Sequence, residues 1–129
     1  MYMNTDCPAN INLRKADIQQ DLPLLAEMNL ALIVDEGHRN SMDIGQLKER
    51  MKVWLKSNYQ AHLILNDDSV IGYCLWREYR EYTYIRQLFI SADFRRQGFA
   101  KNALLWLKIL YGIKPCRLGW RYCQIITMP

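Results

Sequence analysis

The chain lacks several features that would assign it to a common class of protein. No segment approaches the run of about twenty apolar residues that a membrane-spanning helix needs, so we expect no membrane partner. Residues 1–10 have no apolar core and include Asp6, which is unlike a secretory signal, and we interpret them as a leader. Neither G-x-x-x-x-G-K-S/T nor G-x-G-x-x-G occurs, which excludes the two common nucleotide-binding signatures.

The cysteines also lack a recognisable pattern. They form no C-x-x-C pair and have no metal-ligand spacing, so we expect no metal site. Without an export signal, this pattern predicts reduced thiols and a cytoplasmic location. Cys74 lies in an apolar run, which favours a small core residue over a nucleophile. The four cysteines are Cys7, Cys74, Cys116 and Cys123.

What is present is the composition of a globular protein. The 129 residues are 50% hydrophobic and 23% charged, and this length predicts one domain over residues 1–129. Seventeen basic and thirteen acidic residues leave a net charge of +4. This mild excess favours an anionic partner, but a nucleic-acid binder concentrates its charge more strongly, so we expect no nucleic-acid partner.

The first half of the chain predicts a strand and two helices. Residues 11–14 alternate as a strand does. Asp17 or Asp21 is the expected N-cap of a helix that runs to about Val34, with Pro23 in its first turn. A polar break over residues 35–40 separates it from a second helix, whose start is marked by a capping box of Asp43 and Gln46.

The second half changes to strand periodicity and ends in a further helix. Predicted elements are strands at 62–65, 70–76 and 82–90, a polar connection at 77–81, a loop at 91–97, a helix from Gly98 to residues 111–112, and a β-favouring segment at 116–128. The order β-α-α-β-β-β-α-β predicts an α/β (α+β) fold with helices packed on a mostly antiparallel central sheet. Aromatic residues on the central strands are expected in the core or in cross-strand pairs. His62 is expected to face solvent or to pack at the start of its strand.

The most specific signal is a strand, a basic loop and a helix start between residues 85 and 107. The first N–H groups of a helix lack internal partners and carry the positive end of the helix dipole. A turn of small residues at Gly98 lets a phosphate approach the backbone closely, and Arg95 and Arg96 add positive charge there. The segment therefore predicts a pyrophosphate cradle.

The same segment, Arg95-Arg96-Gln97-Gly98-Phe99-Ala100, matches the pattern Q/R-x-x-G-x-G/A. It resembles the acyl-CoA loop of the GNAT superfamily of N-acetyltransferases, in which the loop follows the fourth strand and opens the third helix. Gly72 stands where this family often has a glycine in the third strand. The opening Arg14-Lys15-Ala16, followed by Asp17 and Asp21, is also similar. The resemblance covers roughly residues 11–112.

The resemblance implies an acetyl-CoA-dependent N-acetyltransferase that uses no metal. An amine of a small molecule or a peptide would attack the thioester directly, with no covalent acyl-enzyme. A backbone N–H of the strand would stabilise the oxyanion that develops. The implied cofactor-binding residues are Leu88, Phe89 and Ile90 for the pantetheine arm, and Arg95, Arg96, Gln97, Gly98, Phe99, Ala100 and Lys101 for the pyrophosphate.

Two departures from the family pattern leave alternatives open. Arg86 and Gln87 stand where many members carry a catalytic glutamate, so we expect no strand carboxylate to act as base. Glu36 and His38 are the candidates for that role, because the segment between the first two helices lines the acceptor pocket of the resembled fold. Residues 113–129 form an atypical, short C-terminal segment. The alternative function is therefore a non-catalytic CoA-binding module.

The C-terminal helix carries apolar residues on nearly all its sides, which suggests that more than one side is covered. We therefore predict a homodimer in which residues 116–128 pack against the partner. The alternative is a monomer in which this segment folds back over its own sheet.

Overall fold

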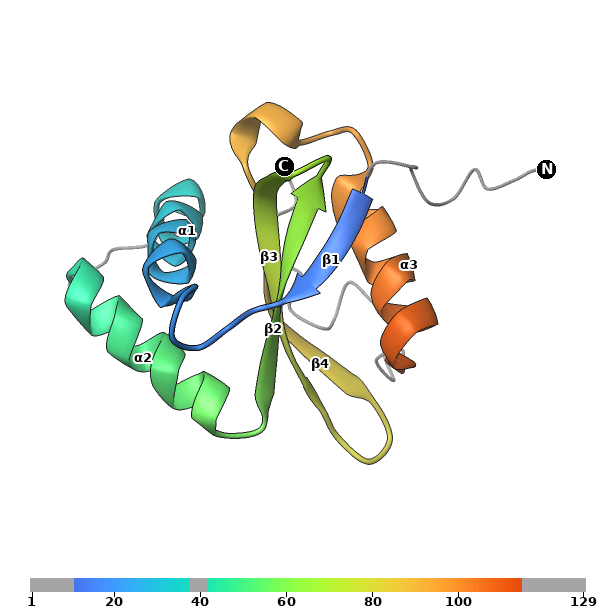
Figure 1. The fold of residues 1–129 in the computed structure, drawn as a ribbon, viewed down its shortest axis with the longest axis horizontal. Coiled ribbons are helices and arrows are strands. Elements are labelled where there is room, and N and C mark those ends of the chain that lie inside the picture. Colours follow the sequence, from blue (N-terminus) through green and yellow to red (C-terminus); the bar gives the residue numbers. More distant parts are fainter. Residues whose placement is uncertain (1–10, 38–41, 115–129) are drawn as a thin grey trace.

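A computed structural model describes residues 11–37 and 42–114 of the chain (Figure 1). In these residues four strands form one antiparallel sheet in the order β1-β2-β3-β4. The elements are β1 (Ile11–Lys15), α1 (Leu22–Asp35), α2 (Ile44–Lys56), β2 (Tyr59–Asn66), β3 (Ser69–Glu78), β4 (Thr83–Ile90), a 3-10 turn η1 (Ala92–Phe94) and α3 (Phe99–Tyr111).

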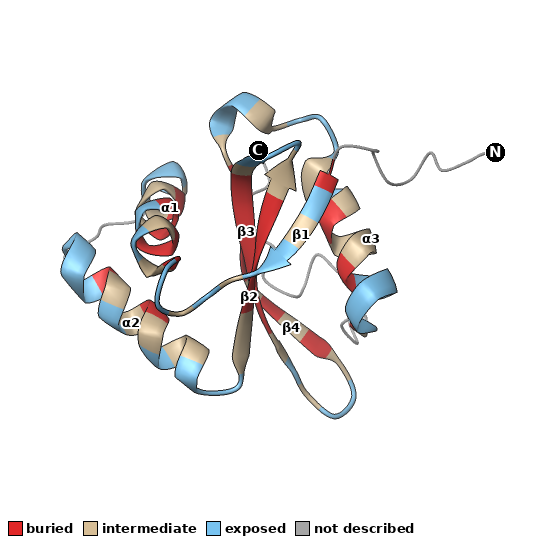
Figure 2. Cartoon of the chain, viewed as in Figure 1, coloured by how far each residue is buried: buried red, intermediate tan, exposed pale blue. Residues whose placement is uncertain are grey.

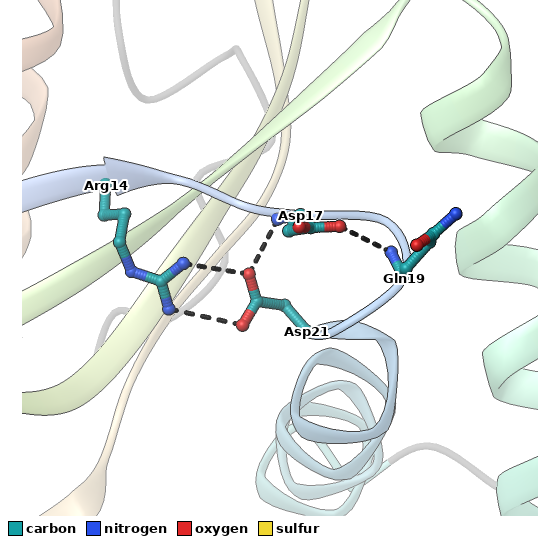
Figure 3. Close-up of polar contacts among 4 residues, drawn as sticks. All are labelled: Arg14, Asp17, Gln19 and Asp21. Atoms are coloured by element: carbon teal, nitrogen blue, oxygen red, sulfur yellow. Dashed lines mark hydrogen bonds and ion pairs between the residues drawn. The ribbon is translucent and has the colours of Figure 1, made fainter.

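The junction of β1 and α1 is held by an ion pair rather than by a side-chain cap. Asp21 occupies the N-cap position, but its carboxylate makes no capping bond to the helix. It instead accepts hydrogen bonds from both terminal nitrogens of Arg14, at 3.0 and 3.2 Å, and from the backbone N–H of Asp17 at 2.6 Å (Figure 3). The Asp17 carboxylate accepts the N–H of Gln19. The prediction that Asp17 or Asp21 is the N-cap is confirmed for Asp21, although its carboxylate binds Arg14 rather than the N–H groups of the helix.

The start of α2 follows its sequence signal. The Asp43 carboxylate accepts the Gln46 backbone N–H at 2.8 Å, and the Gln46 side chain accepts the Asp43 N–H at 2.9 Å. This is the predicted capping box, in which two otherwise unpaired backbone donors are satisfied.

The sheet separates two apolar layers. Figure 1 shows α1 and α2 on one side of the sheet and α3 on the other. Because side chains alternate along a strand, each strand contributes to both layers. The layer under α1 and α2 includes Leu63, Tyr73, Leu75 and Phe89, and the layer under α3 includes Ile64, Cys74, Trp76, Ile85 and Leu88. Figure 2 shows burial concentrated along the middle of the sheet, while the C-terminal end of α3 is exposed.

Strand β4 contains a bulge that changes this alternation. Gln87 lies opposite Leu75 and Ile85 lies opposite Trp76, so Arg86 is an extra residue in β4. As a result Arg86 and Gln87, although adjacent in sequence, both border the space beside α1 and α2.

Gly72 in β3 is required by a close backbone approach. A Cβ atom at this position would lie 1.9 Å from the backbone oxygen of Phe89 in β4. Only glycine therefore allows β3 to approach the end of β4, where the chain turns toward α3.

The fold class and the order of elements as far as α3 are as predicted. Two strands are longer than predicted. Strand β2 begins at Tyr59 rather than at residue 62, and β3 continues to Glu78, into the expected connection at 77–81. His62 does not face solvent but is fully buried. The predicted leader at 1–10 and the β-favouring segment at 116–128 lie outside the described residues.

Candidate functional site

The segment between β4 and α3 has an unusual backbone. After the turn η1, Arg96 has φ of 63° and Gly98 has φ of 81°, both in the left-handed region. Gly98 is the N-cap of α3, and the first intrahelical bond runs from the Asn102 N–H to the Gly98 oxygen at 3.0 Å. The N–H groups of residues 98–101 precede that bond and have no intrahelical acceptor. Left-handed residues beside a helix start form an anion-binding concavity.

The Arg95 side chain folds back against the protein and does not extend from the loop into solvent. Its Nε donates to the backbone oxygen of Ile90 at 2.6 Å, and its Nη2 forms an ion pair with Asp35 at the end of α1. The guanidinium also lies 5.6 Å from the centre of the Phe89 ring. These contacts tie the loop to β4 and α1, so the expected charge at the helix start comes from Arg96 and Lys101 rather than from a free Arg95 side chain.

Two side-chain amides stabilise the loop by hydrogen bonds to its backbone. The Gln97 side chain donates to the backbone oxygen of Asp93 at 3.2 Å. The Asn102 side chain donates to the oxygen of Gly98 at 2.7 Å. Both bonds use backbone oxygens, so they leave the N–H groups at the helix start untouched.

Strand β4 lies at one edge of the sheet in the described part of the chain. The chain that follows α3 contacts the first residue of β4 through two hydrogen bonds. The Thr83 N–H donates to the Lys114 oxygen at 3.2 Å, and the Lys114 N–H donates to the Thr83 hydroxyl at 2.8 Å. Leu88, Phe89 and Ile90 lie at the opposite end of the strand, next to the loop that leads into α3. Their backbone groups are thus the part of this edge closest to the helix start.

A cavity of about 190 Å³ lies between α1, α2 and β4. The bulge brings Arg86 and Gln87 to its wall, and Glu36 borders it at the end of α1. The buried Tyr73 hydroxyl beneath donates to Gln87 at 2.7 Å, and burial raises the pKa of this phenol. The lining residues are Asn29, Leu32, Ile33, Glu36, Arg50, Trp54, Tyr84, Arg86 and Gln87.

The predicted site residues thus fall into two neighbouring groups. The structure brings the ten candidate cofactor residues together along the end of β4 and the start of α3. Of the two candidate bases, Glu36 borders the cavity and His38 lies outside the described residues. Arg50, Trp54 and Asn29 carry no local sequence signal for a site, since they meet at the cavity only because α1 and α2 pack together.

Cys74 lies away from the cavity, as a core residue does. Cys74 is fully buried in the layer under α3, where burial raises the pKa of its thiol. Among the described residues no group of three or more His, Cys, Asp or Glu side chains is arranged to hold a metal ion. No helix within residues 11–37 and 42–114 is long and apolar enough to span a membrane.

An antiparallel sheet with helices on both faces, and a strand that leads through a tight loop into a helix start, are the features that the resemblance to N-acetyltransferases implies. The family model for the acetyltransferase (GNAT) family matches residues 28–110. The chain therefore belongs to the GNAT acetyltransferase family. No curated protein sequence matches it significantly.

Solved structures share this fold at low sequence identity. A predicted acetyltransferase with acetyl-CoA from Clostridium acetobutylicum is 20% identical with a TM-score of 0.64, over 86% of this chain and 84% of that one. An acetyltransferase from Thermus thermophilus is 18% identical with a TM-score of 0.63, over 81% and 71%. A GNAT family acetyltransferase from Staphylococcus aureus is 21% identical with a TM-score of 0.59, over 90% and 83%.

Proposed function

We propose that this chain is a cytoplasmic N-acetyltransferase that transfers the acetyl group of acetyl-CoA to an amine of its acceptor. The observation that carries the proposal is the junction of β4 and α3. Here the edge strand of the described sheet leads through two left-handed residues into a helix start with N–H groups that have no intrahelical acceptor. The acceptor would bind in the cavity beside β4.

The residues at this junction suit a pyrophosphate and a pantetheine arm. The N–H groups of residues 98–101 would hold the pyrophosphate, with added charge from Arg96 and Lys101. The backbone of Leu88, Phe89 and Ile90 would pair with the pantetheine arm as an added strand does. Acetyl-CoA supplies an acetyl group already activated as a thioester. A β4 backbone N–H would stabilise the negative charge that develops on its carbonyl oxygen.

Direct attack by the acceptor amine agrees with the position of the only described cysteine. Cys74 lies in the layer under α3, whereas the cavity lies on the α1 and α2 side of the sheet. A thiol that is fully buried on the other side of the sheet, with a raised pKa, is unsuited to carry the acetyl group.

The proton of the acceptor ammonium must leave before attack. Arg86 and Gln87 border the cavity from β4, and neither side chain accepts a proton at neutral pH. Glu36 borders the same cavity and is our first candidate for this role, with His38 as the second. The test is the rate against pH for the parent, Glu36→Gln and His38→Ala. A loss of less than about threefold in both variants would remove both residues from the mechanism.

Acetyl-CoA binding is tested with a matched pair of glycines at the two ends of α3. Gly98 and Gly112 have φ of 81° and 65°, so valine strains the backbone at either position. Only Gly98 lies at the proposed cradle. We expect acetyl-CoA to raise the melting temperature of the parent and of Gly112→Val, but not of Gly98→Val. Equal shifts in the two variants would show that the pyrophosphate lies elsewhere.

Catalysis needs a separate measurement, because the absence of a β4 carboxylate also fits a module that binds CoA without reacting. A panel of amines is incubated with acetyl-CoA, and free CoA thiol is followed. Thiol release with at least one amine supports the enzyme. A chain that binds acetyl-CoA yet releases no thiol with any amine would favour the non-catalytic module.

The homodimer is part of the same proposal. Ile109 and Leu110, at the C-terminal end of α3, are 64% and 53% exposed, and apolar surface of this kind favours association. Light scattering on the purified chain measures its oligomeric state. A clean monomer at high concentration would contradict the dimer, and deletion of residues 119–129 tests whether that segment forms the contact.

A further inference from the structure

The cavity between α1, α2 and β4 contains two arginines that lie against one aromatic ring. The guanidinium carbons of Arg50 in α2 and Arg86 in β4 are each 4.7 Å from the centre of the Trp54 ring. The two carbons therefore lie within twice that distance of each other. Like charges repel, and an anion that contacts both guanidiniums would relieve this repulsion.

Each guanidinium is held in place by neighbouring side chains. Arg86 donates to the Tyr59 hydroxyl at 3.3 Å and lies 5.7 Å from the centre of that ring. Arg50 donates to the side-chain oxygen of Asn29 at 3.0 Å. The groups are therefore oriented before a ligand arrives, which lowers the entropic cost of binding.

Two buried donors at this place, the Asn29 Nδ2 and the Arg50 Nε, have no acceptor among the described residues. Within residues 11–37 and 42–114 neither Arg50 nor Arg86 takes part in a salt bridge. Burial, together with the charge of Arg86, lowers the pKa of Arg50. Asn29 is fully buried. Buried donors without acceptors are costly, and a ligand with oxygen acceptors would satisfy them.

We propose that the acceptor is an amine that also carries an oxyanion, a carboxylate or a phosphate, and that Arg50 and Arg86 bind this oxyanion in the cavity. This inference rests on the proposed function, since it names the substrate class of the same site. Guanidinium groups suit both oxyanions because they can donate two parallel hydrogen bonds. Glu36, at the end of α1, lines the same cavity. A polyamine has no oxyanion for the two arginines and would be repelled by them.

The test measures binding directly, so it does not depend on catalysis. Calorimetric titrations are made in the presence of CoA with matched pairs of amines that differ only in the anionic group. The twenty L-amino acids are compared with their amides, phosphoethanolamine is compared with ethanolamine, and spermidine represents polyamines. A preference for acids over amides identifies a carboxylate, and a preference for phosphoethanolamine over ethanolamine identifies a phosphate.

The variants separate the two arginines from a general loss of positive charge. Arg86→Met and Arg50→Met remove one guanidinium each, and Arg86→Lys keeps the charge without the paired donors. Arg80→Met is the control, because Arg80 is exposed on the turn between β3 and β4 and does not line the cavity. Melting temperatures verify that every variant is folded. The rise in melting temperature that acetyl-CoA causes tests the proposed cradle separately.

We expect at least one anionic amine to bind about ten- to a hundredfold more tightly than its neutral analogue, which is the range for a charge-assisted hydrogen bond. We expect Arg86→Met and Arg50→Met to lose most of this preference, Arg86→Lys to lose part of it, and Arg80→Met to keep it. The proposal is overturned if no anionic amine binds, if neutral analogues or spermidine bind equally well, or if the cavity variants match Arg80→Met. If acetyl-CoA does not raise the melting temperature of the parent, the proposed function is contradicted instead.

Discussion

The buried His62 predicts a specific loss of stability in mild acid. Its ring is fully buried in β2, its Nδ1 accepts the Trp76 indole N–H at 3.0 Å, and its centre lies 4.4 Å from that of the Tyr111 ring. Burial, with a smaller effect from the charge of Lys15, lowers the pKa of His62 from 6.5 to about 4. The folded chain therefore holds this imidazole neutral under conditions in which the unfolded chain protonates it.

The sign and size of the effect follow from proton linkage. Between pH 6.5 and 4 the unfolded state binds a proton that the folded state does not, so the free energy of unfolding falls as the pH falls. Above pH 6.5 both states are neutral at this site, and the penalty is absent. Lowering the pH from 7.5 to 4 costs about 3 kcal/mol, since each pKa unit corresponds to about 1.4 kcal/mol.

The measurement is urea unfolding of the parent and of His62→Gln at a series of pH values from 7.5 to 4. Glutamine does not titrate, and its oxygen can accept the Trp76 N–H, so the variant keeps that hydrogen bond. We expect the parent to lose about 3 kcal/mol more than the variant over this range. The carboxylates are common to both chains and cancel in the difference. Parallel curves for the two chains would refute the reasoning, because His62 would then be protonated as readily in the folded state as in the unfolded state.

Three further substitutions test the fold. Gly72→Ala places a Cβ 1.9 Å from the Phe89 oxygen, so it must force β3 and β4 apart, and we expect loss of the cooperative unfolding transition in circular dichroism. Asp43→Ala removes one half of the capping box with Gln46, and chemical unfolding should show a loss of about 1 kcal/mol. Leu107→Ala opens a cavity where the side chain is fully buried, which should cost about 2–5 kcal/mol in the same measurement. A value near zero for either of the last two would contradict the packing described.

Features that depend on neighbours in the sequence were predictable. The capping box needs only two side chains three residues apart, and it forms as expected at Asp43 and Gln46. The glycines at both ends of α3 have the left-handed backbone that side chains disfavour, and the predicted ends of that helix agree with them. The order of strands, loop and helices, which also depends on local signals, therefore predicts the fold class.

Features that depend on register or on helix packing were not predictable. The bulge in β4 depends on how β3 pairs with it, and this decides that Arg86 faces α1 and α2. The meeting of Arg50, Arg86 and Trp54 needs three elements to come together. Likewise, Asp21 binds Arg14 because β1 passes the start of α1, a contact that local capping preferences do not anticipate.

The extra residue in β4 also determines how this strand can change in length. Ile85 and Leu88 both face the layer under α3, although three positions separate them, because the bulge lies between them. Deleting either Arg86 or Gln87 would restore strict alternation, and Ile85 would then stand two positions from Leu88 and stay on the same side of the sheet. Tyr84 would likewise stay at the cavity, which would lose one of its two adjacent polar side chains from β4. A single-codon deletion at the bulge would thus preserve the two sides of the strand, whereas a deletion elsewhere in β4 would shift the register and exchange them on one side of the gap.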